Sequence, residues 1–150
     1  MAKLIIQKIL FICTANSCRS QMAEGFVRKL KGNILEPYSA GLKSQHIDPQ
    51  AVKVMSEVGI DISKQQSKLI SDLADIDFDL VITICDDANE KCPLFSGKAK
   101  RYHRAFDNPP ILAESARSED EILAIYRRVR DEIKNFVDQM PANLASDSFD

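Results

Sequence analysis

The sequence predicts an α/β fold with a small parallel sheet, and three observations support this fold class. Residues 4–12 and 80–84 are short runs rich in isoleucine and leucine that lack strict alternation, as expected of strands buried on both faces. Segments with helical spacing of apolar residues separate these runs. The chain has 150 residues and 45% hydrophobic content, which suits a single core, and no repeat or linker divides it. We therefore expect one domain.

The chain begins with two predicted strands on either side of a helix. Residues 4–12 are expected to form the first strand. Residues 21–30 carry apolar side chains at helical spacing, and Gly32 is expected to end this helix. Residues 34–40 are expected to form a second strand, which Pro37 restricts to an edge of the sheet.

A second helix is predicted to begin at Asp48 and to end at Gly59. Asp48 is a typical amino-terminal cap. Pro49 suits the first helical position, because an N–H at that position would have no partner within the helix. Gly59 suits the carboxyl end of the helix. Residues 60–67 are then expected to be loop and residues 69–74 a short helix.

The second half of the chain continues the alternation of strands and helices. Residues 80–84 form the clearest predicted strand, and residues 99–103 are expected to form a fourth. Residues 106–110 contain two adjacent prolines and are expected to be loop. Residues 119–140 have the apolar stripe of a long amphipathic helix.

Charge and hydropathy limit the classes of partner. The net charge of −2 gives no reason to expect binding to nucleic acid or to an anionic membrane. No apolar run approaches the roughly 18 residues that span a bilayer, and no cleavage site of a signal peptide is evident, so we expect a cytoplasmic protein. The acidic, serine-rich residues 141–150 are expected to be a flexible tail, which leaves residues 1–140 as the single domain.

The chain has four cysteines: Cys13, Cys18, Cys85 and Cys92. In a reducing compartment they are not expected to form structural disulfides. Metal ligation, redox chemistry, nucleophilic catalysis and simple burial are the alternatives. Their spacing differs from the usual C-x2-C pairs of zinc sites, and neither histidine lies close in sequence, so we expect no metal and no cofactor.

The residues that join the first strand to the first helix predict an oxyanion site. The amino end of a helix presents N–H groups without helical partners, and the residues before it can curl their own N–H groups inward. Arg19 adds a planar fork that suits an oxyanion, and Ser20 can donate to the Cys13 thiolate, which the same field stabilises. The expected substrate-binding residues are Thr14, Ala15, Asn16, Ser17, Cys18, Arg19 and Ser20.

A simpler interpretation of this loop is a turn that buries a cysteine. The C-x5-R spacing is short and can arise by chance. The strand before the loop, the helix after it and the serine that follows Arg19 favour the anion site. Asn16 tolerates the left-handed conformation that such a tight loop requires. Cys13 is then the candidate nucleophile.

The segment CTANSCRSQMAEG, residues 13–25, resembles the phosphate loop of the low-molecular-weight protein tyrosine phosphatase family, and most of all its thioredoxin-coupled arsenate reductase branch. The resemblance covers nearly the whole chain except its carboxyl-terminal end. It implies a three-layer α/β fold, with a four-stranded parallel sheet flanked by helices, and a catalytic domain over residues 1–140. Besides the loop, it rests on residues 38–41, the segment of Cys85 and Cys92, residues 106–109 and residues 128–133.

The resemblance also implies a general acid at Asp107. Transfer chemistry on Cys13 requires a proton at the departing oxygen, and an aspartate in a proline-containing loop can reach over an anion site. By composition alone, an Asx turn before Pro109 would be the better explanation of this aspartate. The resemblance favours the catalytic role.

Cys85 and Cys92 distinguish the two branches of the family. Cys85 follows a predicted parallel strand, so it shares with Cys13 the sheet edge at which α/β proteins bind ligands. The resemblance implies a relay in which Cys13 attacks arsenate, Cys85 forms a disulfide with Cys13, and Cys92 then attacks Cys85. Thioredoxin would reduce the resulting Cys85–Cys92 disulfide. Cys18 is expected to be structural, or a site of damaging oxidation.

Two other functions stay open at this point. A phosphatase acting on phosphotyrosine or a small phosphoester would need only Cys13, Arg19 and Asp107, with Cys85 and Cys92 incidental. A non-catalytic redox sensor would use the cysteines without turnover. Glutaredoxin is a second candidate reductant, and nothing in the sequence requires more than a monomer.

One residue departs from the pattern of the reductase branch. Some members bind a monovalent cation near the loop, through residues that match Asn16, Glu24 and Ser39 and through an acidic residue. Lys68 stands where that acidic residue would fall. We therefore expect the Lys68 ammonium to take the role of the cation.

Overall fold

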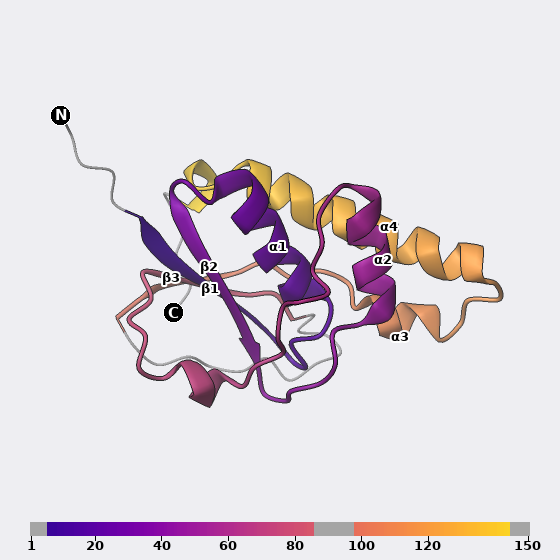
Figure 1. The fold of residues 1–150 in the computed structure, drawn as a ribbon, viewed down its shortest axis with the longest axis horizontal. Helices are drawn as coiled ribbons and strands as arrows, with labels where there is room; N and C mark the ends of the chain where they lie inside the picture. The colour runs from indigo at the N-terminus through magenta and orange to yellow at the C-terminus, as the bar shows by residue number, and fades with distance from the viewer. Residues whose placement is uncertain (1–5, 86–97, 145–150) are drawn as a thin grey trace.

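The computed structural model describes residues 6–85 and 98–144, and Figure 1 shows the path of the chain. Strands and helices alternate along most of it, as the sequence predicts. The elements in chain order are β1 (Gln7–Cys13), α1 (Arg19–Lys31), β2 (Leu35–Gly41), α2 (Pro49–Glu57), the 3-10 helix η1 (Ile70–Leu73), β3 (Leu80–Thr83), β4 (Lys100–His103), α3 (Pro109–Ala113), α4 (Glu119–Asp138) and the 3-10 helix η2 (Ala142–Leu144).

The four strands are parallel and lie in one sheet in the order β2-β1-β3-β4. In the register of this sheet, Ile9 of β1 is opposite Leu80 of β3, and Cys13 is opposite Gly41 of β2. Pro37 lies in β2, an edge strand, where a residue without an N–H is tolerated. The predicted small, four-stranded parallel sheet is confirmed.

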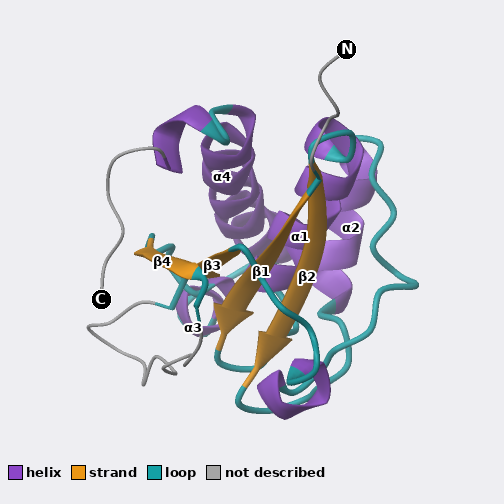
Figure 2. Ribbon diagram, turned by 90° about the vertical axis from the view of Figure 1, so that its left-hand side faces the viewer, coloured by secondary structure: helices purple, strands orange, loops and turns teal. Residues whose placement is uncertain are grey.

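The sheet buries side chains on both faces, because successive residues of a strand point to opposite sides. Ile9 and Phe11 belong to the core beneath α1, α2 and α4, which gather on one side of the sheet (Figure 2). Leu10 and Ile12 face the other side, where Leu73 of η1 packs against them. These four successive residues of β1 are all fully buried, which explains why this apolar run does not alternate. Among the described residues, the helices are therefore unequal: α1, α2 and α4 pack on one face, and η1 lies on the other.

The cap of α2 forms as predicted. The Asp48 carboxylate accepts a hydrogen bond from the Gln50 N–H at 2.9 Å, and Pro49 is the first helical residue. Gly59 follows the helix with a φ of 80°, a conformation that favours glycine. Within residues 6–85 and 98–144, no helix is both long and apolar enough to cross a bilayer.

The expectation of loop throughout residues 106–110 is wrong at its end, because α3 begins at Pro109. Proline is favoured at the first position of a helix: its φ is already helical, and the N–H that it lacks would have no helical partner. The two prolines therefore start a short helix rather than prevent one.

The expectation of a flexible tail from residue 141 is also wrong at its start. Residues 142–144 form η2, and Leu144 is 5% exposed in the core beneath the helices. The Tyr102 hydroxyl of β4 donates a hydrogen bond to the Leu144 carbonyl. Burial of this leucine holds the end of the chain onto the domain at least to Leu144. The remainder of the expected tail, residues 145–150, lies outside the described residues.

Candidate active site

A cavity of about 650 Å³ lies at the carboxyl edge of the sheet. Cys13 at the end of β1, Arg19 at the start of α1 and Asp107 between β4 and α3 all contribute to its lining. The chain moves from β1 to β2 on one side and then returns past β1 to β3 on the other, and open α/β sheets bind ligands where the strand order reverses in this way. The other lining residues are Thr14, Ala15, Ser17, Cys18, Lys43, Gln45, Asn108, Pro110, Ile111 and Leu112.

The backbone of the loop after β1 is held from outside, through its carbonyl groups. The donors and their acceptors are the Leu42 and Lys43 N–H groups to Thr14 (2.9 and 3.0 Å), the Ser67 hydroxyl to Ala15 (3.2 Å), the Gln21 amide to Asn16 (3.0 Å) and the Asp48 N–H to Ser17 (2.8 Å). A peptide carbonyl and the N–H that follows it point in opposite directions. These bonds therefore direct the N–H groups of residues 15–18 toward the concave side of the loop, as an anion site requires.

Asn16 adopts the left-handed conformation that the sequence predicts, with a φ of 50°, and its side chain is fully buried. Gly41 of β2 lies against this tight loop. A Cβ atom at Gly41 would come within 2.7 Å of the Cys13 and Thr14 carbonyl oxygens, so only glycine fits there. The loop therefore packs directly against the backbone of the neighbouring strand, β2.

The Cys13 sulfur lies at the end of a short hydrogen-bond chain within the loop. The Ser20 hydroxyl donates to Cys13 Sγ at 3.3 Å, and the Asn16 amide donates to Ser20 Oγ at 2.8 Å. Both polar side chains are fully buried, where such bonds are strong. A donor aimed at sulfur favours the thiolate, which is the nucleophilic form.

The Arg19 guanidinium joins the anion loop to two other segments. Arg19 Nη1 donates to the Phe106 carbonyl at 3.0 Å and to the Ile84 carbonyl at 3.4 Å. Phe106 precedes Asp107, and Ile84 precedes Cys85. One buried cation therefore fixes the segments of the candidate acid and of the second cysteine relative to the loop.

Three of the four cysteines lie within the described residues, and all three are buried: Cys13, Cys18 and Cys85. The Thr14 hydroxyl donates to Cys85 Sγ at 3.9 Å, so the second thiol lies next to the anion loop although it does not line the cavity. Cys92 lies outside the described residues. The structure thus brings Cys13, Arg19 and Asp107 together at the cavity, and Cys85 lies beside the loop, next to Thr14.

Cys18 is a poor candidate for nucleophilic chemistry. Burial raises the pKa of its thiol well above the ordinary value, and the Asp48 carboxylate and Cys13 add to this effect. The Tyr126 hydroxyl of α4 donates to the same carboxylate at 2.6 Å. Burial, reinforced by this bond, raises the pKa of Tyr126 as well, so the hydroxyl keeps its proton and holds Asp48 beside the loop. A structural role for Cys18 fits these surroundings.

Lys68 lies beside Glu24, where we expected it to replace a cation. Its ammonium is 3.8 Å from Glu24 Oε1, and the Ser39 hydroxyl donates to the same oxygen at 2.6 Å. The Lys68 N–H donates to Asn16 Oδ1 at 2.7 Å, which connects this cluster to the anion loop. The buried Glu24 carboxylate therefore lies within ion-pair distance of the Lys68 ammonium.

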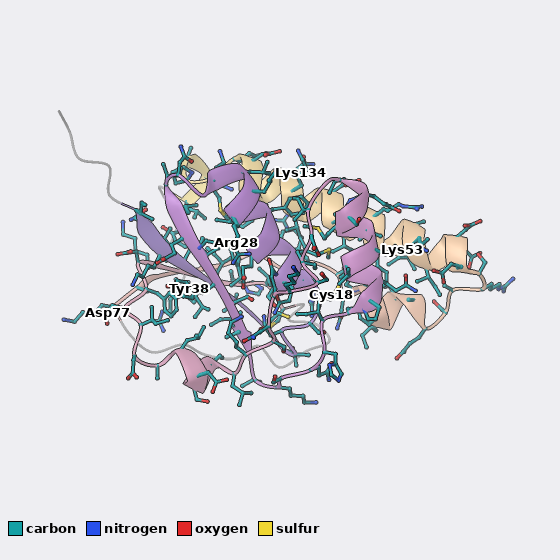
Figure 3. All side chains as sticks on the ribbon, viewed as in Figure 1. Cys18, Arg28, Tyr38, Lys53, Asp77 and Lys134 are labelled. Atoms are coloured by element: carbon teal, nitrogen blue, oxygen red, sulfur yellow. The ribbon has the colours of Figure 1, made fainter. Side chains whose placement is uncertain are left out.

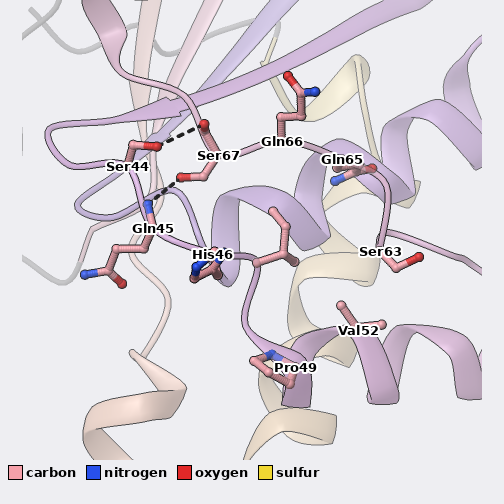
Figure 4. Close-up of a pocket in the computed structure, with 10 residues that line it drawn as sticks. Ser44, Gln45, His46, Pro49, Val52, Ser63, Gln65, Gln66 and Ser67 are labelled. Atoms are coloured by element: carbon pink, nitrogen blue, oxygen red, sulfur yellow. Dashed lines mark hydrogen bonds between the residues drawn. The ribbon is translucent and has the colours of Figure 1, made fainter.

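A larger pocket of about 880 Å³ adjoins the loop, and Figure 4 shows residues of its two walls. Ser67 joins the walls: its hydroxyl accepts a bond from the Gln45 N–H at 3.0 Å, and its carbonyl accepts one from the Ser44 hydroxyl at 3.1 Å. His46 lines this pocket, but its described lining includes neither a thiol nor an arginine or lysine. The chemistry therefore points to the smaller cavity of Cys13.

The described part of the chain contains no group of three histidine, cysteine, aspartate or glutamate residues that could hold a metal ion. Neither histidine is among the described residues that line the cavity of Cys13. The arrangement instead offers a thiol, a guanidinium, inward N–H groups and a carboxyl group. These groups can hold a tetrahedral oxyanion, attack its central atom and protonate a departing oxygen.

Sequence reasoning missed several residues that build the site. Lys43 and Gln45 line the cavity, and they follow the end of β2, which was the available signal because parallel strands end at one edge. Gln21 was assigned only to a helix, although its amide supports the loop. Nothing in the local sequence marks Gln65, which contacts Gln21 from a distant segment.

The fold and the loop agree with comparison to known proteins: residues 8–148 match the low molecular weight phosphotyrosine protein phosphatase family, and the chain belongs to that family. Among curated relatives, an arsenate reductase of Bacillus subtilis (strain 168) is 49% identical over 128 residues, which are 85% of this chain and 89% of the relative. An arsenate reductase of Staphylococcus epidermidis (strain ATCC 12228) is 44% identical over 130 residues, 87% of this chain and 92% of the relative.

Solved structures give the same picture. An arsenate reductase in the oxidised state superposes with a TM-score of 0.71 and 33% identity, over 93% of this chain and 100% of the other. The phosphate-binding state of an arsenate reductase superposes with a TM-score of 0.70 and 32% identity over the same shares. The predicted family and fold are thereby confirmed.

Proposed function

We propose that this chain is an arsenate reductase that uses a thiol relay. The observation that supports this activity over simple hydrolysis is the second thiol: Cys85 is buried next to Thr14 of the anion loop. Hydrolysis of a phosphoester has no need of that thiol, whereas reduction of arsenate requires two electrons, which a pair of thiols can supply. The relatives named arsenate reductase are consistent with this choice.

In the first step, arsenate is held by the N–H groups of the loop and by Arg19. The Cys13 thiolate attacks arsenic, so that an As–S bond forms as an As–O bond breaks, and Asp107 supplies a proton to the oxygen, which leaves as water. Asp107 is suited to this role because it lines the same cavity as Cys13, from the segment between β4 and α3.

In the second step, the Cys85 thiolate attacks Cys13 Sγ. A disulfide forms, the As–S bond breaks, and its electron pair stays on arsenic, which leaves as arsenite. Cys92 then attacks Cys85 Sγ and releases the Cys13 thiolate. The dithiol of thioredoxin reduces the Cys85–Cys92 disulfide and restores the enzyme, as the family resemblance implies. We propose that the protein acts as a monomer in the cytoplasm, where thiols are kept reduced, and contributes there to arsenical resistance.

The test is mass spectrometry of the fully reduced protein after one equivalent of arsenate, with the cysteine-containing peptides mapped. We expect a Cys85–Cys92 disulfide and one equivalent of arsenite. The Cys13→Ser variant should give neither product, since it lacks the nucleophile. Arsenite release without any disulfide would contradict the relay. Thiols that oxidise with peroxide but release no arsenite from arsenate would indicate a redox sensor instead.

A phosphomonoesterase is the second candidate function, and one feature of the cavity favours it. Ile111 is 52% exposed and Leu112 is 36% exposed, and both line the cavity of Cys13. An apolar wall suits an organic leaving group, whereas arsenate itself has no apolar surface to bind. Turnover of an aryl phosphate without arsenite production from arsenate, and with Cys85 and Cys92 still reduced, would establish this function in place of the reductase.

A further inference from the structure

The hydrogen-bond chain that reaches Cys13 does not end inside the loop. Its inner part consists of Ser20 donating to Cys13 Sγ and of Asn16 donating to Ser20, as described above. The Asn16 amide oxygen, in turn, accepts a hydrogen bond from Gln21 Nε2 at 3.0 Å. Gln21 lies in the first turn of α1 and is fully buried. The donor to the nucleophile is thus itself supported by a buried amide outside the loop.

The chain continues from Gln21 to the protein surface. Gln65 Nε2 donates to Gln21 Oε1 at 2.8 Å, and Arg28 Nη1 donates to Gln65 Oε1 at 2.7 Å. Arg28 lies on α1, the helix that follows Cys18, and Figure 3 labels both side chains. Five successive hydrogen bonds therefore connect an exposed guanidinium to the sulfur of Cys13.

Every link of this chain points the same way, and the surrounding groups fix that direction. Asn16 Oδ1 also accepts from the Lys68 backbone N–H at 2.7 Å, so the amide nitrogen of Asn16 must face Ser20. Gln21 Nε2 meets the Asn16 and Gln66 carbonyls, both at 3.0 Å, and therefore must be the donor end. Gln65 Nε2 likewise contacts the Gln21 carbonyl at 3.0 Å. Each amide thus donates toward the sulfur.

We propose that Gln21 and Gln65 are positioning residues that raise the nucleophilicity of Cys13 through this polarised chain. Each donor that itself accepts a hydrogen bond becomes a stronger donor, and the effect is largest in a buried, weakly screened environment. The last donor, Ser20, then favours the thiolate over the thiol. Gln21 has a second effect on the same site, because it holds the Asn16 carbonyl away from the anion. The inference rests on the proposed function only in taking Cys13 as the nucleophile.

Charged groups lie near both ends of the chain, and the two glutamines themselves carry no charge. At the outer end, Arg28 also pairs with Glu24 at 2.6 Å, and Glu24 is close to Lys68. At the sulfur, Arg19, Lys43 and Asp107 line the same cavity, and the thiols of Cys18 and Cys85 are near the loop. A glutamine-to-methionine change alters none of these charges, so its effect reports on the hydrogen bonds themselves.

The test measures the rate at which iodoacetamide alkylates Cys13, followed on its own peptide by mass spectrometry and without arsenate. Gln21→Met removes the donor to Asn16 at similar volume. Gln65→Met removes the donor to Gln21 and, like Gln21→Met, adds no charge, although it also loses the bond from Arg28. Gln66→Met is the matched control, because only the backbone carbonyl of Gln66 takes part and its side chain is exposed. Thermal unfolding of each variant is measured in parallel.

We expect Gln21→Met to slow alkylation near neutral pH by roughly three- to tenfold, as loss of one buried hydrogen bond implies. Gln65→Met should slow it in the same direction, and in both variants the rate should recover as the pH rises, because thiolate then forms without help. Gln66→Met should match the wild type. Since Gln65 is only partly buried, its variant tests the proposal even if Gln21→Met fails to fold.

Unchanged alkylation in Gln65→Met would overturn the proposal, whatever the unfolding temperature of that variant. A slower rate that does not recover at high pH would also overturn it, because that result would indicate restricted access rather than a weaker thiolate. The measurement needs no turnover, so a protein that never reduces arsenate would contradict the proposed function and leave this inference separately testable.

Discussion

The Arg128 guanidinium of α4 lies 3.0 Å from the carboxylate of Asp107, which lines the cavity from the segment between β4 and α3. The same arginine lies 3.0 Å from Glu132, one turn further along α4. Because α4 also carries Tyr126, which holds Asp48 beside the anion loop, one helix supports both the candidate acid and the loop.

Arg128→Met should lower the kcat of arsenate reduction and leave the KM for arsenate nearly unchanged. The exposed ion pair contributes about 1 kcal/mol at most, so we expect kcat to fall by roughly two- to fivefold. Arg127→Met is the control, since Arg127 pairs with Glu57 instead. In an Asp107→Asn background, Arg128→Met should have no further effect. An equal loss in both backgrounds would show that Arg128 does not act through Asp107.

Cys92→Ser should trap the protein after one turnover as a Cys13–Cys85 disulfide. The third thiol is then missing, so nothing resolves the first disulfide, and arsenite release should stop at one equivalent. Non-reducing peptide mapping measures the trapped bond. The wild type treated in the same way serves as the control, because its Cys92 can resolve the first disulfide. Sustained turnover of Cys92→Ser with thioredoxin would contradict the order of the steps.

Turnover of the wild type should be insensitive to potassium, because the Lys68 ammonium already lies beside the buried Glu24 carboxylate. Lys68→Ala removes that charge and leaves a carboxylate with less compensation, which is costly in a buried site. We expect slower turnover that added potassium restores, measured at constant ionic strength. Lys64→Ala, at an exposed position nearby, is the control. Strong potassium activation of the wild type would refute the role of Lys68.

Glu57→Gln should lower stability at neutral pH, with the difference from the wild type shrinking in acid. Hydrogen bonds from Arg127, and then from Arg130, lower the pKa of Glu57 from 4.5 to about 2. A carboxyl with a depressed pKa stabilises the fold above its unfolded value of 4.5, and that stability is lost as the pH falls toward about 2. Urea unfolding at several pH values measures this. Glu114→Gln, at an exposed position, is the control, and a difference that stays constant with pH would exclude the mechanism.

The local sequence was sufficient for much of the fold. Whether a run is a strand, where Asp48 caps a helix and why Asn16 turns left-handed depend on neighbours in the chain, so pattern and propensity predict them. The predicted loop was wrong at Pro109, and the predicted tail was wrong at Leu144. Proline can end a helix or start one, and a single leucine before the acidic, serine-rich end is buried only because Tyr102 and the core accept it.

The candidate site divides in the same way. The nucleophile, the guanidinium and the inward N–H groups belong to residues 13–20, so the sequence alone determined an oxyanion loop with a thiol. The groups that support this loop come from elsewhere. Arg19 reaches the Phe106 carbonyl across 87 positions, and Gln65 reaches Gln21 across 44. No local pattern encodes such pairs, because they depend on which loops meet at the edge of the sheet.

The sequence by itself therefore determined the candidate nucleophile and the loop proposed to hold an anion, because those groups are adjacent in the chain. Only the tertiary structure decided how the thiol is supported. The folded chain connects Arg28, Gln65 and Gln21 by successive hydrogen bonds. It also pairs Arg128 with Asp107. The reason is geometric: hydrogen bonds act over about 3 Å, and only the folded chain brings those atoms that close.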